Sequence, residues 1–155
     1  MIDLKRVVIF SLIIFIIDQL VKLAIGFGID VNTSFVVIKN FFSLSNVHNY
    51  GAAFSILYGN RIFLIIVSIF ALVFVYYFML KNKDLSKLDI AIYSLLIGGI
   101  LGNMFDRIVY GYVVDFFDFH IFGYDFPVFN IADICIVISV FLILCDTIRG
   151  YNNGN

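Results

Sequence analysis

The sequence predicts a mainly α membrane protein, with four transmembrane helices and a small extracytoplasmic β-sheet on the membrane surface. Of its 155 residues, 63% are hydrophobic and 14% are charged, and the mean hydropathy is +1.07. Soluble domains carry about 25% charged residues. A soluble monomer of this composition would expose large apolar patches and aggregate. The other two observations are four long apolar stretches and a separate run of strand-like sequence.

The four apolar stretches each have about the length that an α-helix needs to cross the hydrocarbon core, roughly 20 residues. We expect spans over residues 7–25, 62–80, 90–108 and 128–145. Lys5 and Arg6 precede the first stretch, as they would in a secretory signal peptide. It lacks a small-residue cleavage site, however, and contains Asp18 and Lys22, so we interpret it as a span.

The basic residues in the short connections predict the orientation of these spans. Six of the ten lie before the first span, between the second and third, or after the fourth: Lys5, Arg6, Lys81, Lys83, Lys87 and Arg149. We therefore expect a multi-pass protein with both termini in the cytoplasm. Segments 26–61 and 109–127 would be extracytoplasmic.

Residues 31–48 have a different sequence pattern from the spans. They are short β-branched and aromatic runs broken by Asn and Ser, a pattern typical of strands joined by turns. This segment predicts the sheet on the membrane surface. Because the chain shows no internal repeat and no linker, we expect residues 1–155 to form a single membrane domain.

The polar residues within the spans all lie at one predicted depth. Ionisable groups in a span are costly and indicate a functional site by default. They lie in the outer half of the first span, at the outer end of the third and in the first turns of the fourth: Asp18, Lys22, Asn103, Asp106, Arg107, Asn130 and Asp133. Since the spans alternate in direction, a common depth is not expected of groups placed without regard to function.

Each of these groups also has a purely structural interpretation. Asp18 and Lys22 are four residues apart and can form an internal ion pair that makes insertion tolerable. Gly98, Gly99 and Gly102 are typical of close helix packing. Asn130 and Asp133 could serve as polar contacts between helices. These alternatives remain open at the level of the sequence.

The aspartates differ in the partners that the sequence offers them. Lys22 is predicted to hold Asp18 ionised, and Arg107 is predicted to do so for Asp106. Asp133 has no basic partner within a turn, and Asp115 is flanked by Val and Phe. Two such carboxyls brought together would share a proton, which gives one base and one acid. Asp118 and Asp125 are interpreted as solvated loop acids, and His48 and His120 as isolated interfacial residues.

Several classes of protein find no support. The net charge of −1 does not suggest a nucleic-acid partner. Cys135 and Cys145 lack metal-ligand spacing, and no His-Glu-x-x-His motif is present, so we expect neither a metal nor a cofactor. The serines inside the spans do not lie in a Gly-x-Ser-x-Gly motif, so the sequence does not indicate a serine protease. Two alternatives to an enzyme remain: a small membrane transporter or proton-relay protein, and a non-enzymatic chaperone.

Five short motifs resemble those of the bacterial lipoprotein signal peptidases, the type II signal peptidases. The motifs appear in the family's order across the whole chain: Asp18-Gln19-x-x-Lys22, Asn49-x-Gly51-Ala52-Ala53-Phe54, Gly98-Gly99-x-x-Gly102-Asn103-x-x-Asp106-Arg107, Val113-Val114-Asp115-Phe116 and Phe126-Pro127-x-Phe129-Asn130-x-Ala132-Asp133. Each is weak alone, and the five together are specific.

The resemblance implies an intramembrane aspartyl endopeptidase of the bacterial cell membrane, with its site near the outer face. Its substrates would be diacylglyceryl-modified prolipoproteins, cleaved just before the lipidated Cys. The catalytic pair would be Asp115 and Asp133. The supporting or substrate-binding residues would be Asp18, Lys22, Asn49, Gly51, Asn103, Asp106, Arg107 and Asn130. The resemblance also implies a mobile loop within residues 31–60. Membrane lipids would be the other partners, and we expect a monomer.

Overall fold

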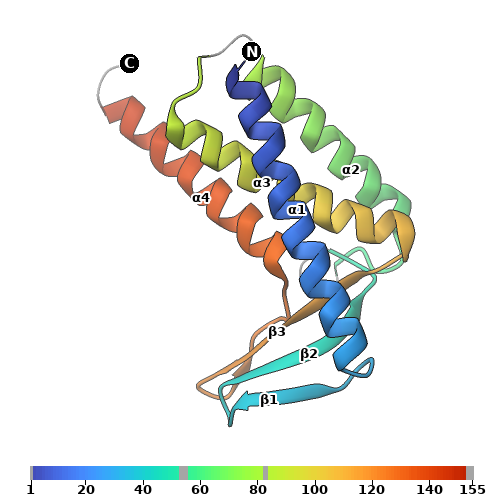
Figure 1. Cartoon of the computed structure of the whole chain (residues 1–155). Helices are drawn as coiled ribbons and strands as arrows, with labels where there is room; N and C mark the ends of the chain where they lie inside the picture. Colours follow the sequence, from blue (N-terminus) through green and yellow to red (C-terminus); the bar gives the residue numbers. More distant parts are fainter. Residues whose placement is uncertain (1, 53–55, 82–83, 153–155) are drawn as a thin grey trace.

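The computed structural model describes residues 2–52, 56–81 and 84–152. Four helices pack side by side, and a small sheet lies at the end of the bundle opposite the start of α1 and the end of α4 (Figure 1). The helices are α1 (Ile2–Gly28), α2 (Arg61–Phe74), α3 (Lys87–Val109) and α4 (Ile131–Asn152). A π-helical segment, η2 (Val75–Leu80), continues α2. All four are long and apolar enough to cross a membrane, which confirms the four expected spans.

The fourth helix begins later than the sequence predicted, at Ile131 rather than 128. Pro127 cannot donate a backbone hydrogen bond, and the chain around it runs alongside a strand instead. The backbone N–H groups of Phe116 and Phe117 donate to the Phe129 carbonyl at 3.0 and 2.8 Å. The helix therefore starts only where Asn130 can cap it.

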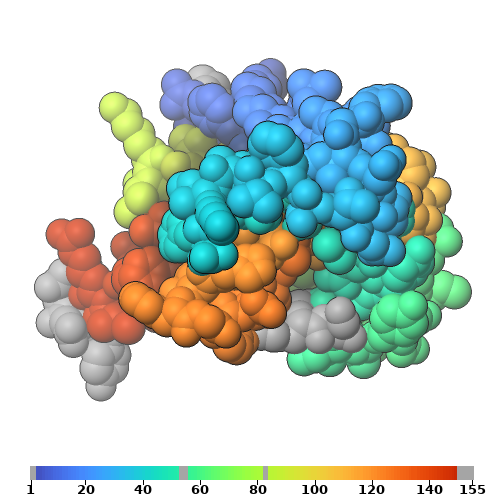
Figure 2. Space-filling model, turned by 90° about the horizontal axis from the view of Figure 1, so that it is seen from below, coloured from blue at the N-terminus to red at the C-terminus, as the bar shows by residue number. Residues whose placement is uncertain are grey.

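The sheet has four antiparallel strands in the order β1-β2-β3-β4. The strands are β1 (Ser34–Ile38), β2 (Phe42–Asn49), β3 (Val113–Ile121) and β4 (Tyr124–Asp125). The first two confirm the strands expected within residues 31–48. The other two come from segment 109–127, which was not predicted to be strand. Seen from the sheet end, the strand segments (cyan and orange) lie across the helix ends (Figure 2).

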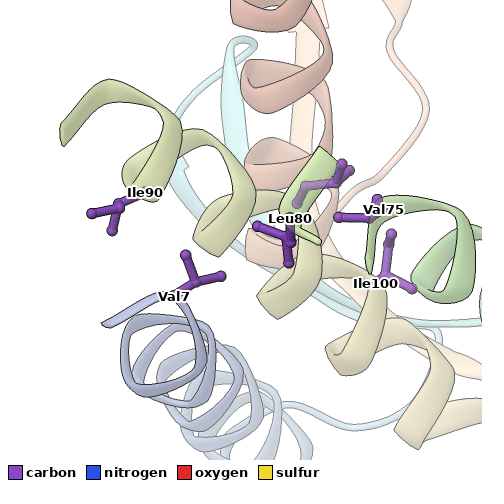
Figure 3. Close-up of a cluster of buried hydrophobic side chains, with 6 residues drawn as sticks. Val7, Val75, Leu80, Ile90 and Ile100 are labelled. Atoms are coloured by element: carbon purple, nitrogen blue, oxygen red, sulfur yellow. The ribbon is translucent and has the colours of Figure 1, made fainter. Parts of the chain in front are cut away.

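Helix α3 forms the centre of the bundle. Half of the residues in its most apolar stretch are buried, whereas less than a quarter are buried in the corresponding stretch of each of the other three spans. Its Ile90, Leu96 and Ile100 join a hydrophobic cluster with Val7 of α1 and Val75 and Leu80 of η2 (Figure 3). The remaining helices carry many exposed apolar side chains, as expected of surfaces that face lipid.

The small residues of α3 let α1 and α4 approach it closely. A Cβ atom at Gly98 would lie 2.8 Å from the Ile14 side chain. At Gly99 it would lie 2.5 Å from the Ala132 carbonyl oxygen, and at Gly102 it would lie 2.5 Å from Asp18 Oδ2. These glycines therefore serve the close packing that their spacing predicted.

Substitution of Gly99 by Ala tests this packing. Because backbone, not a flexible side chain, stands in the way, we expect Gly99→Ala to destabilise the protein by about 1–3 kcal/mol. Gly28→Ala is the matched control, since a Cβ there meets nothing within 4 Å. Thermal unfolding in detergent measures both variants. Equal midpoints for the two would contradict the packing argument.

Candidate active site

Asp115 lies on β3 and is brought to the centre of the sheet by its pairing with Val47 of β2. Its neighbour Phe116 packs in a second hydrophobic cluster with Val114 and with Ile25 of α1. This packing fixes the strand against the end of α1. Asp115 itself is only 3% exposed, so its carboxyl needs polar partners within the protein.

Two asparagine amides supply those partners. Asn49 Nδ2 donates to Asp115 Oδ2 at 2.9 Å, and Asn130 Nδ2 donates to Oδ1 at 2.6 Å. The first amide comes from the end of β2 and the second from the residue before α4. Both oxygens of the buried carboxyl are therefore held by residues distant in the sequence.

Asp133 is positioned by the start of α4. Its backbone N–H donates to Asn130 Oδ1 at 2.9 Å, and its Oδ2 accepts from the Asn130 backbone N–H at 3.2 Å. This reciprocal pair is a capping box, which satisfies two N-terminal N–H groups at once. Asn103 Nδ2 of α3 donates to the other oxygen, Oδ1, at 2.7 Å. Asn130 thus contacts both acids, Asp115 through its amide nitrogen and Asp133 through its backbone N–H.

A buried ammonium group lies behind this pair. Lys22 Nζ is 2.8 Å from Asp18 Oδ2, 2.8 Å from Asp106 Oδ2 and 3.0 Å from Asn103 Oδ1. The Asp18–Lys22 pair expected from the sequence is therefore present. Asp18 Oδ1 also accepts from the Ala132 backbone N–H at 2.9 Å. The same carboxylate therefore pairs with Lys22 and caps α4.

The expected pairing of Asp106 with Arg107 is wrong. The partners of Asp106 are Lys22, the Gln19 side-chain amide at 2.8 Å and the Val114 backbone N–H at 3.3 Å. Adjacent residues on a helix do not face each other, so Arg107 points elsewhere. Gln19 belongs to this network but was not among the predicted site residues. Its position three residues before Lys22, on the same helix face, was the available signal.

Arg107 instead holds the chain that follows β2. Its guanidinium donates to the Gly51 carbonyl at 2.8 Å and to the Asn103 carbonyl at 3.2 Å. The Gly51 N–H in turn donates to Asn49 Oδ1 at 2.9 Å, which orients the amide that contacts Asp115. Ala53 and Phe54 of the second motif, and Lys83, lie outside the described residues.

The two acids line one cavity of about 480 Å³. Its polar lining consists of Asn49, Asn103, Arg107, Asp115 and Asp133. Residues 126–129 and four residues of α4, Ile134, Ile136, Val137 and Ile138, line its apolar part. All predicted site residues except Asp18, Lys22, Gly51, Asp106 and Asn130 therefore line the cavity. Lys22, Gly51 and Asn130 contact residues that do, and Asp18 and Asp106 are linked to the cavity through Lys22.

Burial, and after it the nearby charge of Asp133, raise the pKa of Asp115 to about 7. The hydrogen bonds from Asn49 and Asn130 and the charge of Lys22 act in the opposite direction. Asp115 is thus a carboxyl that can hold a proton near neutral pH. Asp133, in contrast, is only half-buried and lies in the first turn of α4.

The remaining titratable residues of the sheet lie away from this pair. Asp118 is not a loop acid as expected but part of β3, where it accepts from Ser45 Oγ at 2.7 Å. Asp125 is exposed in β4, with His120 Nε2 at 3.4 Å. His48 stacks on Tyr112, with 3.7 Å between the ring centroids. Among the described residues, no group of three or more His, Cys, Asp or Glu could hold a metal ion.

The fold and site define a polytopic membrane protein with two carboxyls on the wall of a largely apolar cavity. Two solved structures described as a bacterial membrane enzyme share this fold. One has a TM-score of 0.87 at 38% identity and covers 97% of this chain and 92% of its own. The other has a TM-score of 0.80 at 39% identity and covers 92% of each chain.

The sequence comparisons identify the family. The family model for signal peptidase (SPase) II matches residues 10–149. The lipoprotein signal peptidases of Staphylococcus aureus strains Newman and N315 are each 39% identical over 146 residues, which is 94% of this chain and 90% of the relative. The chain belongs to the signal peptidase II family. These matches favour a peptidase over the transporter considered as the alternative.

Substitution of Lys22 by Met tests the buried charge network. It leaves two buried carboxylates without their ammonium partner, a change that costs about 3–5 kcal/mol for buried pairs. We expect a correspondingly large drop in the unfolding midpoint. Lys39→Met, at an exposed position, is the control and should unfold like the wild type. If Lys22→Met did the same, the network would not stabilise the bundle.

Proposed function

We propose that this chain is an intramembrane aspartyl endopeptidase with Asp115 and Asp133 as its catalytic pair. It would remove the signal peptide from diacylglyceryl-modified prolipoproteins by cleaving just before the lipidated Cys. The observation that carries the proposal is the contact of Asn130 with both carboxyls at the wall of one cavity. The name that the relatives carry, lipoprotein signal peptidase, supports the choice of substrate.

The unequal environments of the two acids support different roles for them. Ionised Asp133 accepts a proton from water, and the water oxygen attacks the scissile carbonyl carbon. Protonated Asp115 donates its proton to the carbonyl oxygen, which yields a tetrahedral diol. Asp133 then passes its proton to the leaving nitrogen as the C–N bond breaks, and Asp115 recovers a proton from the diol hydroxyl. The sum of these steps is the addition of one water across the peptide bond.

The supporting residues act by holding this geometry. Asn49, Asn103 and Asn130 orient the two carboxyls through the hydrogen bonds described above. Lys22, Asp18 and Asp106 hold the ends of α1, α3 and α4 together. Arg107 lines the cavity and fixes Gly51, so its charge stands near a developing oxyanion.

The apolar part of the cavity suits a lipidated substrate. Val137 and Ile138 line the cavity and are also exposed on the surface of α4. In a membrane this surface faces lipid, so a signal peptide or an acyl chain can enter sideways without crossing water. The access path thus matches a substrate that is itself membrane-bound.

The orientation also belongs to this proposal. We place both termini in the cytoplasm and the site near the outer face, with residues 1–155 acting as one domain and as a monomer. In support, α1 begins and α4 ends at the end of the bundle far from the sheet (Figure 1). The basic Lys5, Arg6, Lys81, Lys87 and Arg149 occupy the corresponding ends of the helices, as the positive-inside rule requires.

Neutralising either acid tests the catalytic pair. Asp115→Asn and Asp133→Asn should each lower the cleavage of a purified diacylglyceryl prolipoprotein by at least about 10²–10⁴-fold, because each removes one proton-transfer partner. Asp118→Asn, on the same strand as Asp115, is the matched control and should retain most activity. A chelator should change nothing. Near-normal turnover by either variant in folded protein would exclude the pair.

The pH dependence of turnover tests the assignment of roles. Asp115, with its pKa raised to about 7, is protonated below that pH and loses its proton above it. We therefore expect kcat/KM to fall above about pH 7, as the acid is lost. Asp118→Asn should leave this alkaline limb in place. A rate that stays constant well above pH 7 would contradict Asp115 as the acid.

The pH dependence of the free energy of unfolding tests the raised pKa of Asp115 without a measurement of turnover. The pKa of Asp115 is raised on folding, so the folded state binds more protons than the unfolded state between about pH 4 and 7. The stability that Asp115 contributes is therefore complete at low pH and is lost as the pH rises to about 7. Asp115→Asn should remove this part of the pH dependence, measured by unfolding at a series of pH values.

A further inference from the structure

The turn between β3 and β4 carries a phenylalanine at a position that disfavours it. Phe122 and Gly123 join the two strands between Ile121 and Tyr124, which pair with each other. Phe122 has a φ of 50° and Gly123 a φ of 81°, so both central residues of the turn are left-handed. Asn, Asp or Gly usually occupies the first of these positions, because other side chains are strained there. The backbone of the turn therefore does not account for Phe122.

The ring of Phe122 is not buried within the protein either. Phe122 is 105% exposed, the highest value among the large hydrophobic residues that the structure describes. Even Phe70, on the outer surface of the span α2, is only 69% exposed. An apolar ring in water is unfavourable. The strained backbone and the full exposure of Phe122 both point to a surrounding that the described chain does not supply.

Three further apolar residues lie beside Phe122 at this end of the sheet. Ile121, Tyr124 and Phe126 are 40%, 59% and 42% exposed. We call these four residues the apolar tip. Exposed apolar groups of this kind mark a surface that meets a membrane or another protein.

The tip belongs to one face of the β3–β4 hairpin. Side chains alternate along a strand, so Ile121 and Phe119 share a face of β3 with Asp115. Tyr124 of β4 pairs with Ile121 and therefore lies on the same face. The apolar face of the hairpin is thus the face of the sheet that carries Asp115.

The opposite face of the hairpin is polar. It carries Asp118, His120 and Asp125. Asp118 Oδ2 accepts from Ser45 Oγ at 2.7 Å, and His120 Nε2 lies 3.4 Å from Asp125 Oδ1. Elements that lie in a membrane interface separate an apolar face from a polar face in this way.

The tip is continuous with the lipid-facing side of the bundle. Phe126 lines the cavity of the two acids together with Val137 and Ile138 of α4, and all three are exposed. Seen from the sheet end, the orange hairpin projects on the side of the molecule where α4 (red) lies (Figure 2). Because α4 is long and apolar enough to cross the membrane, the lipid beside it also reaches the tip. This continuity favours a lipid surface as the occupant.

We propose that the apolar tip is a membrane anchor. The Phe122 ring inserts into the leaflet at the sheet end, and Tyr124 lies at the level of the head groups. The hairpin turns its Asp115 face toward the membrane and its Asp118 face toward water. Since Phe126 belongs to the tip and lines the cavity, the anchor holds the cavity wall at the lipid boundary. The anchor does not depend on the proposed peptidase activity, whereas its effect on turnover rests on that proposed function.

A single tryptophan tests where the tip lies. The chain contains no Trp, so Phe122→Trp gives the full-length protein one fluorophore and keeps an aromatic ring in the tip. Asp125→Trp, on the polar face of the same hairpin, is the matched control. Phe141→Trp, at an exposed position of α4, is the reference for a side chain in lipid. Each protein is placed in nanodiscs of phosphatidylcholine with and without bromine on the acyl chains near the head group.

We expect brominated lipid to quench Phe122→Trp severalfold more than Asp125→Trp, and iodide in the buffer to quench them in the opposite order. Equal iodide quenching of both without quenching by lipid places the tip in water and overturns the proposal. Blue-shifted emission of Phe122→Trp without quenching by lipid, while Phe141→Trp is quenched, places the tip against protein, such as a second copy, and also overturns it. Equal quenching of both hairpin variants by lipid overturns the assignment of the faces.

Phe122→Asn separates the anchor from the turn. Asn is favoured at this position of the turn, so the unfolding midpoint in detergent should equal or exceed that of the wild type. In nanodiscs the KM for a diacylglyceryl prolipoprotein should rise severalfold with kcat little changed, because the cavity wall is no longer held at the lipid from which the substrate enters. Asp125→Asn is the control and should keep the wild-type KM.

An unchanged KM for Phe122→Asn would overturn the role of the anchor at the cavity. A wild type that does not cleave the substrate at all would refute the proposed function and leave the fluorescence result standing. Failure of the anchor and failure of the proposed peptidase are therefore distinguishable.

Discussion

The structure depends on the burial of one ammonium group, that of Lys22. Placing this charge inside a membrane bundle is costly unless it is paired and hydrogen-bonded. Its three acceptors come from α1 itself and from two positions of α3. Asp18 extends the contact to the first turn of α4 through the Ala132 N–H. Because each acceptor must remain in place to compensate the charge, Lys22 fixes three helices relative to one another.

The hydrogen bonds around Lys22 continue through two asparagines to the two acids. Asn103 accepts from Lys22 and from the Asn130 amide, and it donates to Asp133. Asn130 caps α4 and donates to Asp115. Polar groups that stabilise helix ends are therefore the groups that orient the carboxyls. A polar residue of this site can therefore stabilise the helix packing and orient the carboxyls at the same time.

Much of this arrangement could be predicted from the sequence, because hydropathy and helical spacing are local properties. They predicted the four spans, the Asp18–Lys22 pair and the common depth of the polar residues. The partner of Asp106 could not be predicted, because Lys22 reaches it from another helix. The strand character of residues 113–121 was missed because its acids and aromatics gain their partners only in the fold, from β2, β4 and residues 129–130. The late start of α4 depends on the pairing of Phe129 with β3.

The contrast between the two acids follows from the elements that carry them. Asp115 sits on a strand, which has little net dipole, and it is almost wholly buried at the wall of the cavity, so its neutral form is favoured. Asp133 sits in the first turn of a helix, where it forms a capping box with Asn130, and it remains partly exposed to the cavity. Joining a strand to a helix end at Asn130 therefore makes two identical side chains chemically unlike. In the proposed mechanism, that difference lets Asp115 hold a proton while Asp133 accepts one.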